Sequence, residues 1–226
     1  MASPHNRRSK KPRIYKYHLK GHQLEAVDTT KYLGVDLSYN LSWNHHIDRT
    51  VKKGNSMLGF LKRNLKISNQ DTKSAAYLSL VRPNLEYCAS IWNPYSIQSI
   101  KKLEMVQRQA ARYATNRYRN TSSVTDILDN LEWETLESRR TKIQLVMFFK
   151  IINDLVDIPS SNYLIPANSK TRSNHSKKMQ QYHTRSDVFK YSFFPRTTRN
   201  WNQSLATIAE ILDLFSFKRG LSSVTF

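Results

Sequence analysis

The sequence predicts a mainly α-helical protein that carries a small antiparallel β-meander near its N-terminus. Three observations predict this class. Apolar residues recur at three- and four-residue steps over most of the chain. Only 5 of the 226 residues are glycine, fewer than a turn-rich β-sandwich uses. Hydrophobic residues make up 39% of the chain and aromatic residues 11%, which is enough to bury a core.

The β-meander is predicted within residues 14–40. Side chains that favour strands lie at 14–17, 24–27 and 31–38, and Lys20-Gly21 supplies a turn between the first two segments. Three such short strands are not stable by themselves, so we expect helices to cover them. The preceding residues 1–13 have no apolar period and predict a flexible basic arm, with a nuclear-import signal or a phosphate-binding arm as alternatives.

Residues 41–118 are predicted to be a helical region. The helical period begins at His45 and continues to about Leu65, with Gly54 on the apolar stripe. A second helix is predicted from Asn69, which can act as its N-cap, to Val81, with Pro83 ending it or starting the next. The third helix is the longest, and it is predicted from Ile97 to Ala114 with Ile100, Leu103, Val106, Ala110 and Tyr113 facing inward.

Residues 119–226 are predicted to form a C-terminal helical region. Its predicted parts, in chain order, are a short acidic helix capped by Ser122 or Ser123, an almost wholly apolar helix within 134–154, a long polar loop at about 156–185, and a helix that starts at Pro195 and carries Trp201. The apolar helix has hydrophobic side chains nearly all round, so it is expected to lie buried between neighbouring elements.

The charge of the chain predicts a polyanionic partner. The formal net charge is +19 and the sequence pI is about 10.1. Residues 1–20 carry seven basic residues and no acid, whereas residues 120–138 carry five acids and no base. Residues 170–199 again carry eight basic residues against one acid. This segregation indicates that particular faces of the protein meet phosphate groups.

The sequence predicts no catalytic centre. It has no adjacent aspartate pair for magnesium, no glycine-rich phosphate loop and no Gly-x-Ser-x-Gly motif. A zinc site is not expected either, because there is one cysteine and because His45 and His46 point about 100° apart on a helix. We therefore expect no metal, no cofactor and no small-molecule substrate. Cys88 is predicted to be a small buried hydrophobic residue.

The location predicted from the sequence is nuclear or cytoplasmic, not secreted. A single cysteine is typical of a reducing compartment, and the basic, polar N-terminus does not resemble a signal sequence. The chain has no apolar run long enough for a transmembrane helix, so no membrane partner is expected.

Basic and aromatic side chains predict a nucleic-acid-binding surface. Two sets of cations lie opposite the apolar stripes of the predicted helices, and they are Arg49, Lys52, Arg63 and Lys66 in the first helix and Lys101, Arg108 and Arg112 in the longest. Aromatic residues occur near both ends of the chain, among them Trp43 and Trp201. The alternative for the four tryptophans is that they anchor the core.

Six blocks of sequence carry a resemblance to a known family. In order, they are KYLGVDLSYNLSWNHHI, LGFLKRNL, KSAAYLSLVRPNLEYCASIWNPY, IKKLEMVQRQAARY, SVTDILDNLEWETLESRR and SFFPRTTRNWN. Over about residues 14–220, the chain resembles the C-terminal part of jockey-like non-LTR (LINE-type) retrotransposon reverse transcriptases. The resemblance implies a thumb-like role for the helices of 41–118 and, as partner, RNA or an RNA–DNA or DNA duplex. It also implies a primer grip, the turn that places the growing 3′ end, made by Lys31, Tyr32, Leu33, Gly34 and Val35.

The departures from that family concern its catalytic parts. The palm with its Tyr-x-Asp-Asp strand and the upstream endonuclease have no counterpart in this sequence. The expectation is therefore a truncated RNA-directed DNA polymerase that still binds template–primer but does not polymerise alone. The alternatives are a host-recruited RNA- or chromatin-binding protein and a relic without function. For Gly34, a close approach to nucleic acid and close packing of the next helix both remain open.

Overall fold

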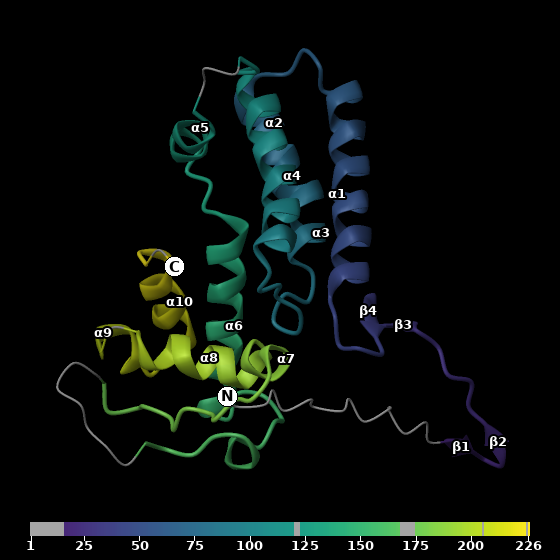
Figure 1. Ribbon diagram of the computed structural model, residues 1–226. Helices are drawn as coiled ribbons and strands as arrows, with labels where there is room; N and C mark the ends of the chain where they lie inside the picture. Colours follow the sequence, from purple (N-terminus) through teal and green to yellow (C-terminus); the bar gives the residue numbers. More distant parts are fainter. Residues whose placement is uncertain (1–15, 120–122, 168–174, 205, 225) are drawn as a thin grey trace, which may run out of the picture.

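The computed structural model describes residues 16–119, 123–167, 175–204, 206–224 and 226. The protein is mainly α-helical and has two small antiparallel sheets near its N-terminus, which confirms the predicted fold class. Figure 1 shows an upper bundle of upright helices and a lower layer of shorter helices that run across it, with α6 joining the two. The predicted basic arm at 1–13 lies outside the described residues.

The β-region consists of two hairpins, so the prediction of three strands is wrong. The paired strands are β1 (His18–Leu19) with β2 (His22–Gln23), and β3 (Thr29–Tyr32) with β4 (Val35–Ser38). The predicted single strand at 31–38 folds back on itself at Leu33 and Gly34, whose φ angles are 44° and 86°. Residues 24–27 form no strand and instead connect the hairpins.

The upper bundle follows the predicted helices closely. Its elements are α1 (Asn44–Asn64), α2 (Gln70–Ala76), the π-helical turn η1 (Tyr77–Val81), α3 (Arg82–Glu86), α4 (Ile97–Thr115) and α5 (Val124–Asn130). The side chain of Asn69 caps α2 by accepting the N–H of Thr72 at 2.9 Å. The second helix was expected to end at Val81 with Pro83 ending it or starting the next, and α3 does begin at Arg82 with Pro83 in its first turn. Pro83 has no N–H to donate to the preceding turn, and the wider π-turn accommodates it.

The first hydrophobic core lies where one face of α1 packs against α3 and α4. A Cβ atom on Gly54 of α1 would lie 2.8 Å from Leu85 of α3 and 3.4 Å from Val106 of α4, so glycine allows this close approach. Tyr113 of α4 places its hydroxyl 3.0 Å from the carbonyl oxygen of Leu61, in the last turn of α1. The Leu61 carbonyl also accepts the N–H of Leu65 at 2.8 Å, and the Tyr113 hydroxyl lies 3.1 Å from the carbonyl oxygen of Leu65, so this side chain ties α4 to the end of α1.

The lower part has a second hydrophobic core around α6. Its elements are α6 (Leu136–Ile152), the 3₁₀ turn η2 (Ser160–Asn162), α7 (Asp187–Lys190), α8 (Phe193–Asn202), α9 (Ala206–Ala209) and α10 (Leu214–Ser222). Phe149 of α6 stacks on Phe217 of α10 with ring centroids 4.3 Å apart, and Phe148 lies 5.5 Å from Trp201 of α8. The apolar helix is therefore buried between neighbours, as predicted. Helix α8 begins two residues earlier than predicted, and Pro195 lies in its first turn.

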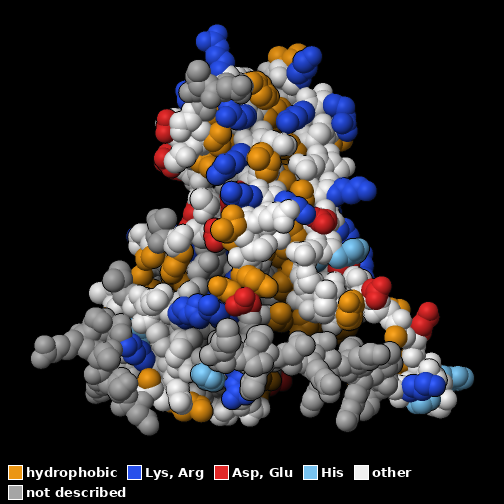
Figure 2. Space-filling view, viewed as in Figure 1, with side chains coloured by type: hydrophobic (Ala, Val, Ile, Leu, Met, Phe, Trp, Pro, Cys, Tyr) orange, Lys and Arg blue, Asp and Glu red, His pale blue; other side chains and the backbone are white. Residues whose placement is uncertain are grey.

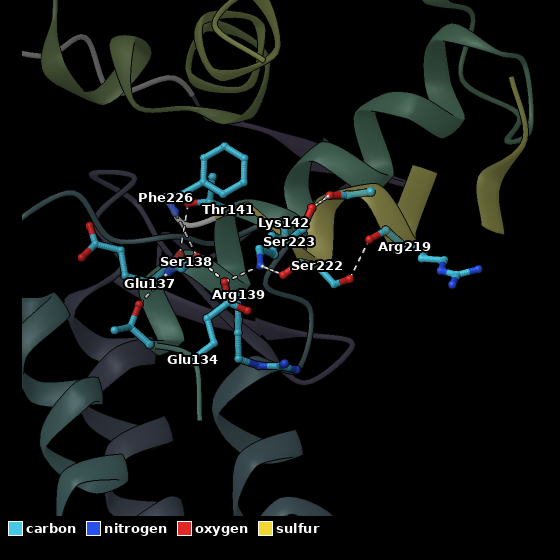
Figure 3. A network of polar contacts seen from close by, with 12 residues as sticks. Glu134, Glu137, Ser138, Arg139, Thr141, Lys142, Arg219, Ser222, Ser223 and Phe226 are labelled. Atoms are coloured by element: carbon cyan, nitrogen blue, oxygen red, sulfur yellow. Dashed lines mark hydrogen bonds and ion pairs between the residues drawn. The ribbon is translucent and has the colours of Figure 1, made fainter. Parts of the chain in front are cut away.

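Polar contacts tie the end of the chain to the first half of α6 (Figure 3). Lys142 pairs with Glu134 at 2.6 Å and donates to the carbonyl oxygen of Ser222 at 3.3 Å. The backbone N–H of Phe226 donates to the hydroxyl of Ser138 at 3.3 Å. These contacts place α10 and the last residue against α6.

Candidate nucleic-acid interface

A groove of about 1150 Å³ opens between the β3–β4 hairpin, α1 and the end of α3. The turn at Leu33 and Gly34 forms one wall, and the face of α1 from His46 to Arg63 forms another. Pro83, Asn84 and Tyr87 close the third side. The groove therefore joins parts of the chain that are more than 50 positions apart.

The groove is basic. The cations that line it are Lys31, Arg49, Lys52, Lys53 and Arg63, and no acidic residue of the described chain lines it. Figure 2 shows Lys and Arg side chains gathered over the upper part of the molecule, where α1, α2 and α4 lie, with few acidic side chains among them. Such a surface attracts phosphate groups and displaces their counterions.

Exposed apolar side chains stand among these cations. Phe60 of α1 is 49% exposed and Leu33 of the turn is 72% exposed. Met57, Pro83 and Tyr87 complete the apolar part of the lining. Cations beside exposed rings suit a nucleic acid, because phosphates pair with the cations while sugars and bases contact the apolar atoms.

Arg49 fixes the hairpin to α1. Its guanidinium donates to the carbonyl oxygen of Gly34 at 2.5 Å and pairs with Asp36 at 2.5 Å. The hydroxyl of Tyr87 donates to the carbonyl oxygen of Leu33 at 3.0 Å. Two side chains thus hold the two turn carbonyls, and the wall of the groove is anchored from both α1 and the end of α3. Arg49 was predicted to contact phosphate, and two of the five N–H groups of its guanidinium are used in these contacts inside the protein.

Two features favour glycine at position 34: the conformation of the turn and the packing of the Tyr87 ring. Its φ of +86° lies in the left-handed region that residues with a Cβ atom rarely adopt. A Cβ atom there would lie 3.1 Å from the ring of Tyr87, so Gly34 does allow close packing, but against the residue that follows α3 and not against the next helix. The glycine also keeps the turn backbone bare on the side of the groove.

His46 lies buried beneath the same hairpin. Its Nδ1 accepts the backbone N–H of Asp36 at 3.2 Å and lies 3.4 Å from that carboxylate. The ring packs edge-on against Trp92 with centroids 4.8 Å apart. Burial lowers the pKa of His46, and the nearby Asp36 carboxylate opposes that shift. His46 is therefore part of the hairpin anchor, not only a polar residue at the start of a helix.

The neighbouring His45 is exposed and lies 3.7 Å from the same carboxylate oxygen of Asp36. Within the described ranges, no group of three or more His, Cys, Asp or Glu side chains is arranged to hold a metal ion. Asp36 and the two histidines therefore have a structural role, and Arg49 supplies the main positive charge that balances the Asp36 carboxylate.

The structure brings together half of the predicted binding residues. Those that line the groove are Lys31, Leu33, Gly34, Arg49, Lys52 and Arg63. Tyr32 is 65% exposed beside it, whereas Val35 is buried in the first core. Lys66 is exposed just beyond the end of α1. Lys101, Arg108 and Arg112 do not line the groove, because they lie on α4 opposite its buried stripe.

Sequence reasoning missed Lys53, Phe60 and Tyr87. Phe60 carried a signal, since it is a large apolar residue among the cations of α1 and lies off the stripe formed by Leu58 and Leu61. Tyr87 carried none, because it reaches the groove through the packing of α3 on α1.

The tryptophans serve as core anchors. Trp92 and Trp201 are fully buried and Trp133 is 5% exposed, while Trp43 is half-buried against the first core. The aromatic residues of the groove are instead Phe60 and Tyr87. Cys88, predicted to be buried, is half-buried at the edge of the first core.

No protein-family model, no curated protein and no solved structure matches the chain. The resemblance to non-LTR reverse transcriptases therefore stays a prediction from the sequence. No helix in the described part of the chain is both long and apolar enough to cross a bilayer.

Proposed function

We propose that the protein holds a nucleic-acid duplex by its backbone in the groove between the β3–β4 hairpin and α1. The proposed role is that of the primer grip and thumb of a non-LTR reverse transcriptase. The observation that carries the proposal is the convergence of six predicted residues in one groove whose described lining includes no acid. Residues from Lys31 to Arg63 come together there, although the sequence places them on different elements.

The chemistry of the groove fits a partner that is bound without regard to sequence. Lysine and arginine contacts to phosphate supply affinity and carry no base information. The exposed side chains of Phe60 and Leu33 offer apolar surface to sugars and base faces. The turn at Gly34 presents backbone to the partner, and Arg49 and Tyr87 hold that turn in place. A pre-formed wall of this kind loses little conformational entropy when a ligand binds.

We further propose that the chain binds nucleic acid without polymerising it. Magnesium-dependent nucleotidyl transfer uses carboxylates that hold metal ions, and the sequence has no adjacent aspartate pair. Asp36, two residues after the glycine of the groove's turn, is buried and paired with Arg49. A nuclear or cytoplasmic location is part of this proposal, since both compartments hold RNA and DNA partners.

Fluorescence anisotropy with an RNA–DNA hybrid that has a recessed 3′ end tests the proposal. The double variant Lys52→Ala/Arg63→Ala removes two exposed groove cations and should weaken binding roughly tenfold, about 1.4 kcal/mol. The slope of log K against log salt should fall in magnitude by about two, because two phosphate contacts are lost.

The matched control is Lys218→Ala/Arg185→Ala, which removes two exposed cations from the lower part of the molecule. It should change affinity less than about twofold, apart from a small effect of net charge. If both variants weaken binding equally, affinity comes from net charge and the groove assignment is wrong. Magnesium-dependent nucleotide incorporation by the purified chain would contradict the second part of the proposal.

A further inference from the structure

The outer face of α4 carries a second basic surface, which we call the α4 ridge. It consists of Lys101, Arg108, Arg112, Arg117 and Arg119. The first three lie on the side of α4 opposite its buried stripe. Arg112 donates to the carbonyl oxygens of Arg117 and Arg119, both at 3.2 Å, so it folds the residues after the helix back against its end. The ridge is therefore a built surface and not only a helix face.

Four of the five cations of the α4 ridge are not paired with acidic side chains of the described chain. No ion pair joins Lys101, Arg108, Arg117 or Arg119 to a carboxylate within the described residues. The acid of the same helix, Glu104, is turned away, since its carboxylate accepts the backbone N–H of Glu137 at 2.8 Å. Burial raises the pKa of Glu104.

The α4 ridge also exposes apolar side chains, and it is long enough to contact several phosphate groups. Met105 and Tyr118 are 50% and 58% exposed among the cations. From Lys101 to Arg112 the helix rises about 16 Å, which is the length of roughly five phosphates along one strand of duplex DNA. The combination of unpaired cations with exposed apolar side chains is the same one that marks the groove.

The α4 ridge and the groove open on different sides of the bundle. Helices α3 and α4 pack against the same face of α1, since Gly54 faces both Leu85 and Val106. The groove opens on the α3 side of α1, and no α4 residue lines it. The ridge lies on the face of α4 opposite its buried stripe, so the groove and the ridge share no residue.

We propose that the α4 ridge binds a second nucleic-acid segment while the groove holds the first, so that one chain bridges two duplexes. This inference rests on the proposed function of the groove. Charge complementarity selects the occupant, because the four cations without a carboxylate partner require a polyanion and the exposed side chains of Met105 and Tyr118 add contacts to sugars.

A bead-capture experiment tests the bridging. One duplex is fixed to beads through biotin, the protein is added with a second, fluorescent duplex, and the captured fluorescence is measured. Three double variants are compared: Lys101→Ala/Arg108→Ala in the ridge, Lys52→Ala/Arg63→Ala in the groove, and Lys218→Ala/Arg185→Ala as the control. Binding of a single duplex with a recessed 3′ end is measured in parallel, and sedimentation reports the oligomeric state.

The ridge variant should bind a single recessed duplex within about twofold of the wild-type affinity but capture at least about fivefold less of the second duplex. The control should capture as much as the wild type. Unchanged capture by the ridge variant overturns the bridging proposal, as does saturation of the wild-type chain at one duplex. The proposal for the groove is tested separately by the single-duplex measurement. If the groove variant binds a single duplex as tightly as the wild type, both proposals are wrong.

Discussion

The segment from α1 to α4 and the chain that follows it contain equal numbers of cations but use them differently. Residues 44–119 contain fourteen Lys and Arg against four Asp and Glu, whereas residues 120–226 contain fourteen against ten. The larger net positive charge of the α1 to α4 segment therefore comes from fewer acids, not from additional bases. A surface of that kind is available to an external polyanion, because its cations have few internal partners.

In the lower part, the cations of α6 and α8 build the structure. Arg140 is fully buried, and its Nε donates to the side chain of Asn93 at 3.3 Å. Arg196 donates to the backbone carbonyl of the same Asn93 at 3.0 Å. Burial lowers the pKa of both arginines, that of Arg196 to about 10. These two side chains fix the segment before α4 against the lower layer, so they are not available to a ligand.

The largest expected effect comes from a charge placed in the first core. Leu103→Asp should lower the free energy of unfolding by about 4 kcal/mol, because an unpaired carboxylate would be buried between α1 and α4. Lys101→Ala, two residues away on the exposed face, should change it by less than about 0.5 kcal/mol. Denaturant unfolding checks both. Similar values for the two variants would contradict the assignment of the faces of α4.

A substitution that creates a cavity in the second core tests whether the two regions are independent. Trp201→Ala removes a fully buried ring that contacts Phe148 and Phe217, and it should cost about 3–5 kcal/mol. Duplex affinity should stay within about twofold below the melting temperature, since the groove belongs to the first core. The exposed Phe215→Ala is the control for loss of a ring. A parallel loss of affinity in the Trp201 variant would show that the bundle depends on the lower part.

The hairpin turn gives a smaller effect with a matched control. Gly34→Ala places a Cβ atom 3.1 Å from Tyr87 at a φ of +86° and should cost about 1–2 kcal/mol. Gly21→Ala has a similar φ of +83° with no atom within 4 Å, so it carries the backbone strain alone. Thermal melts and anisotropy check the pair. Only in the Gly34 variant do we expect the affinity for a recessed 3′ end to fall more than the affinity for a blunt duplex.

Equal losses for both duplex ends in that variant would mean that Gly34 serves packing alone. Losses in both glycine variants would mean that strain, and not the position in the groove, decides the effect. Either result would remove the primer-grip interpretation from the turn and leave the basic face of α1 to account for binding.

The smallest expected effect is a pH dependence from His46. Its pKa is lower in the folded protein than the ordinary value of 6.5, so the unfolded chain binds the proton first as pH falls. The stability that His46 contributes is complete above pH 6.5 and declines as pH drops toward its folded pKa. His46→Gln keeps an acceptor for the Asp36 N–H and should show a flatter decline between pH 7.5 and 5. Identical pH profiles would contradict this account.

The positions of the helices were predictable because they depend on local features of the sequence. The cap at Asn69 and the inward stripe of α4 depend on neighbours within a few residues, and the structure confirms both. The β-region was predicted less well because Leu33 adopts a left-handed φ of 44°, which its side chain does not signal. Tertiary contacts with Arg49 and Tyr87 hold that turn.

The sequence predicted the kind of candidate site but not which residues form it. Periodicity placed Lys52 and Arg63 on the exposed face of α1, and both line the groove. It placed Arg49 there as well, but could not show that Asp36, thirteen positions earlier, pairs with it. It also could not show that the cations of α4 lie outside the groove, because the arrangement of packed helices depends on contacts far apart in the sequence.

Photocross-linking from the 3′ end of a nucleic acid tests the groove assignment most directly. A recessed duplex with 4-thiouridine as its terminal nucleotide is bound at less than one duplex per chain, irradiated, and mapped by mass spectrometry. The groove predicts cross-links within residues 31–34, 49–63 and 83–87, which form its three walls. Cross-links that fall mainly within residues 136–222, or that follow exposed lysines and arginines throughout the chain, would contradict it.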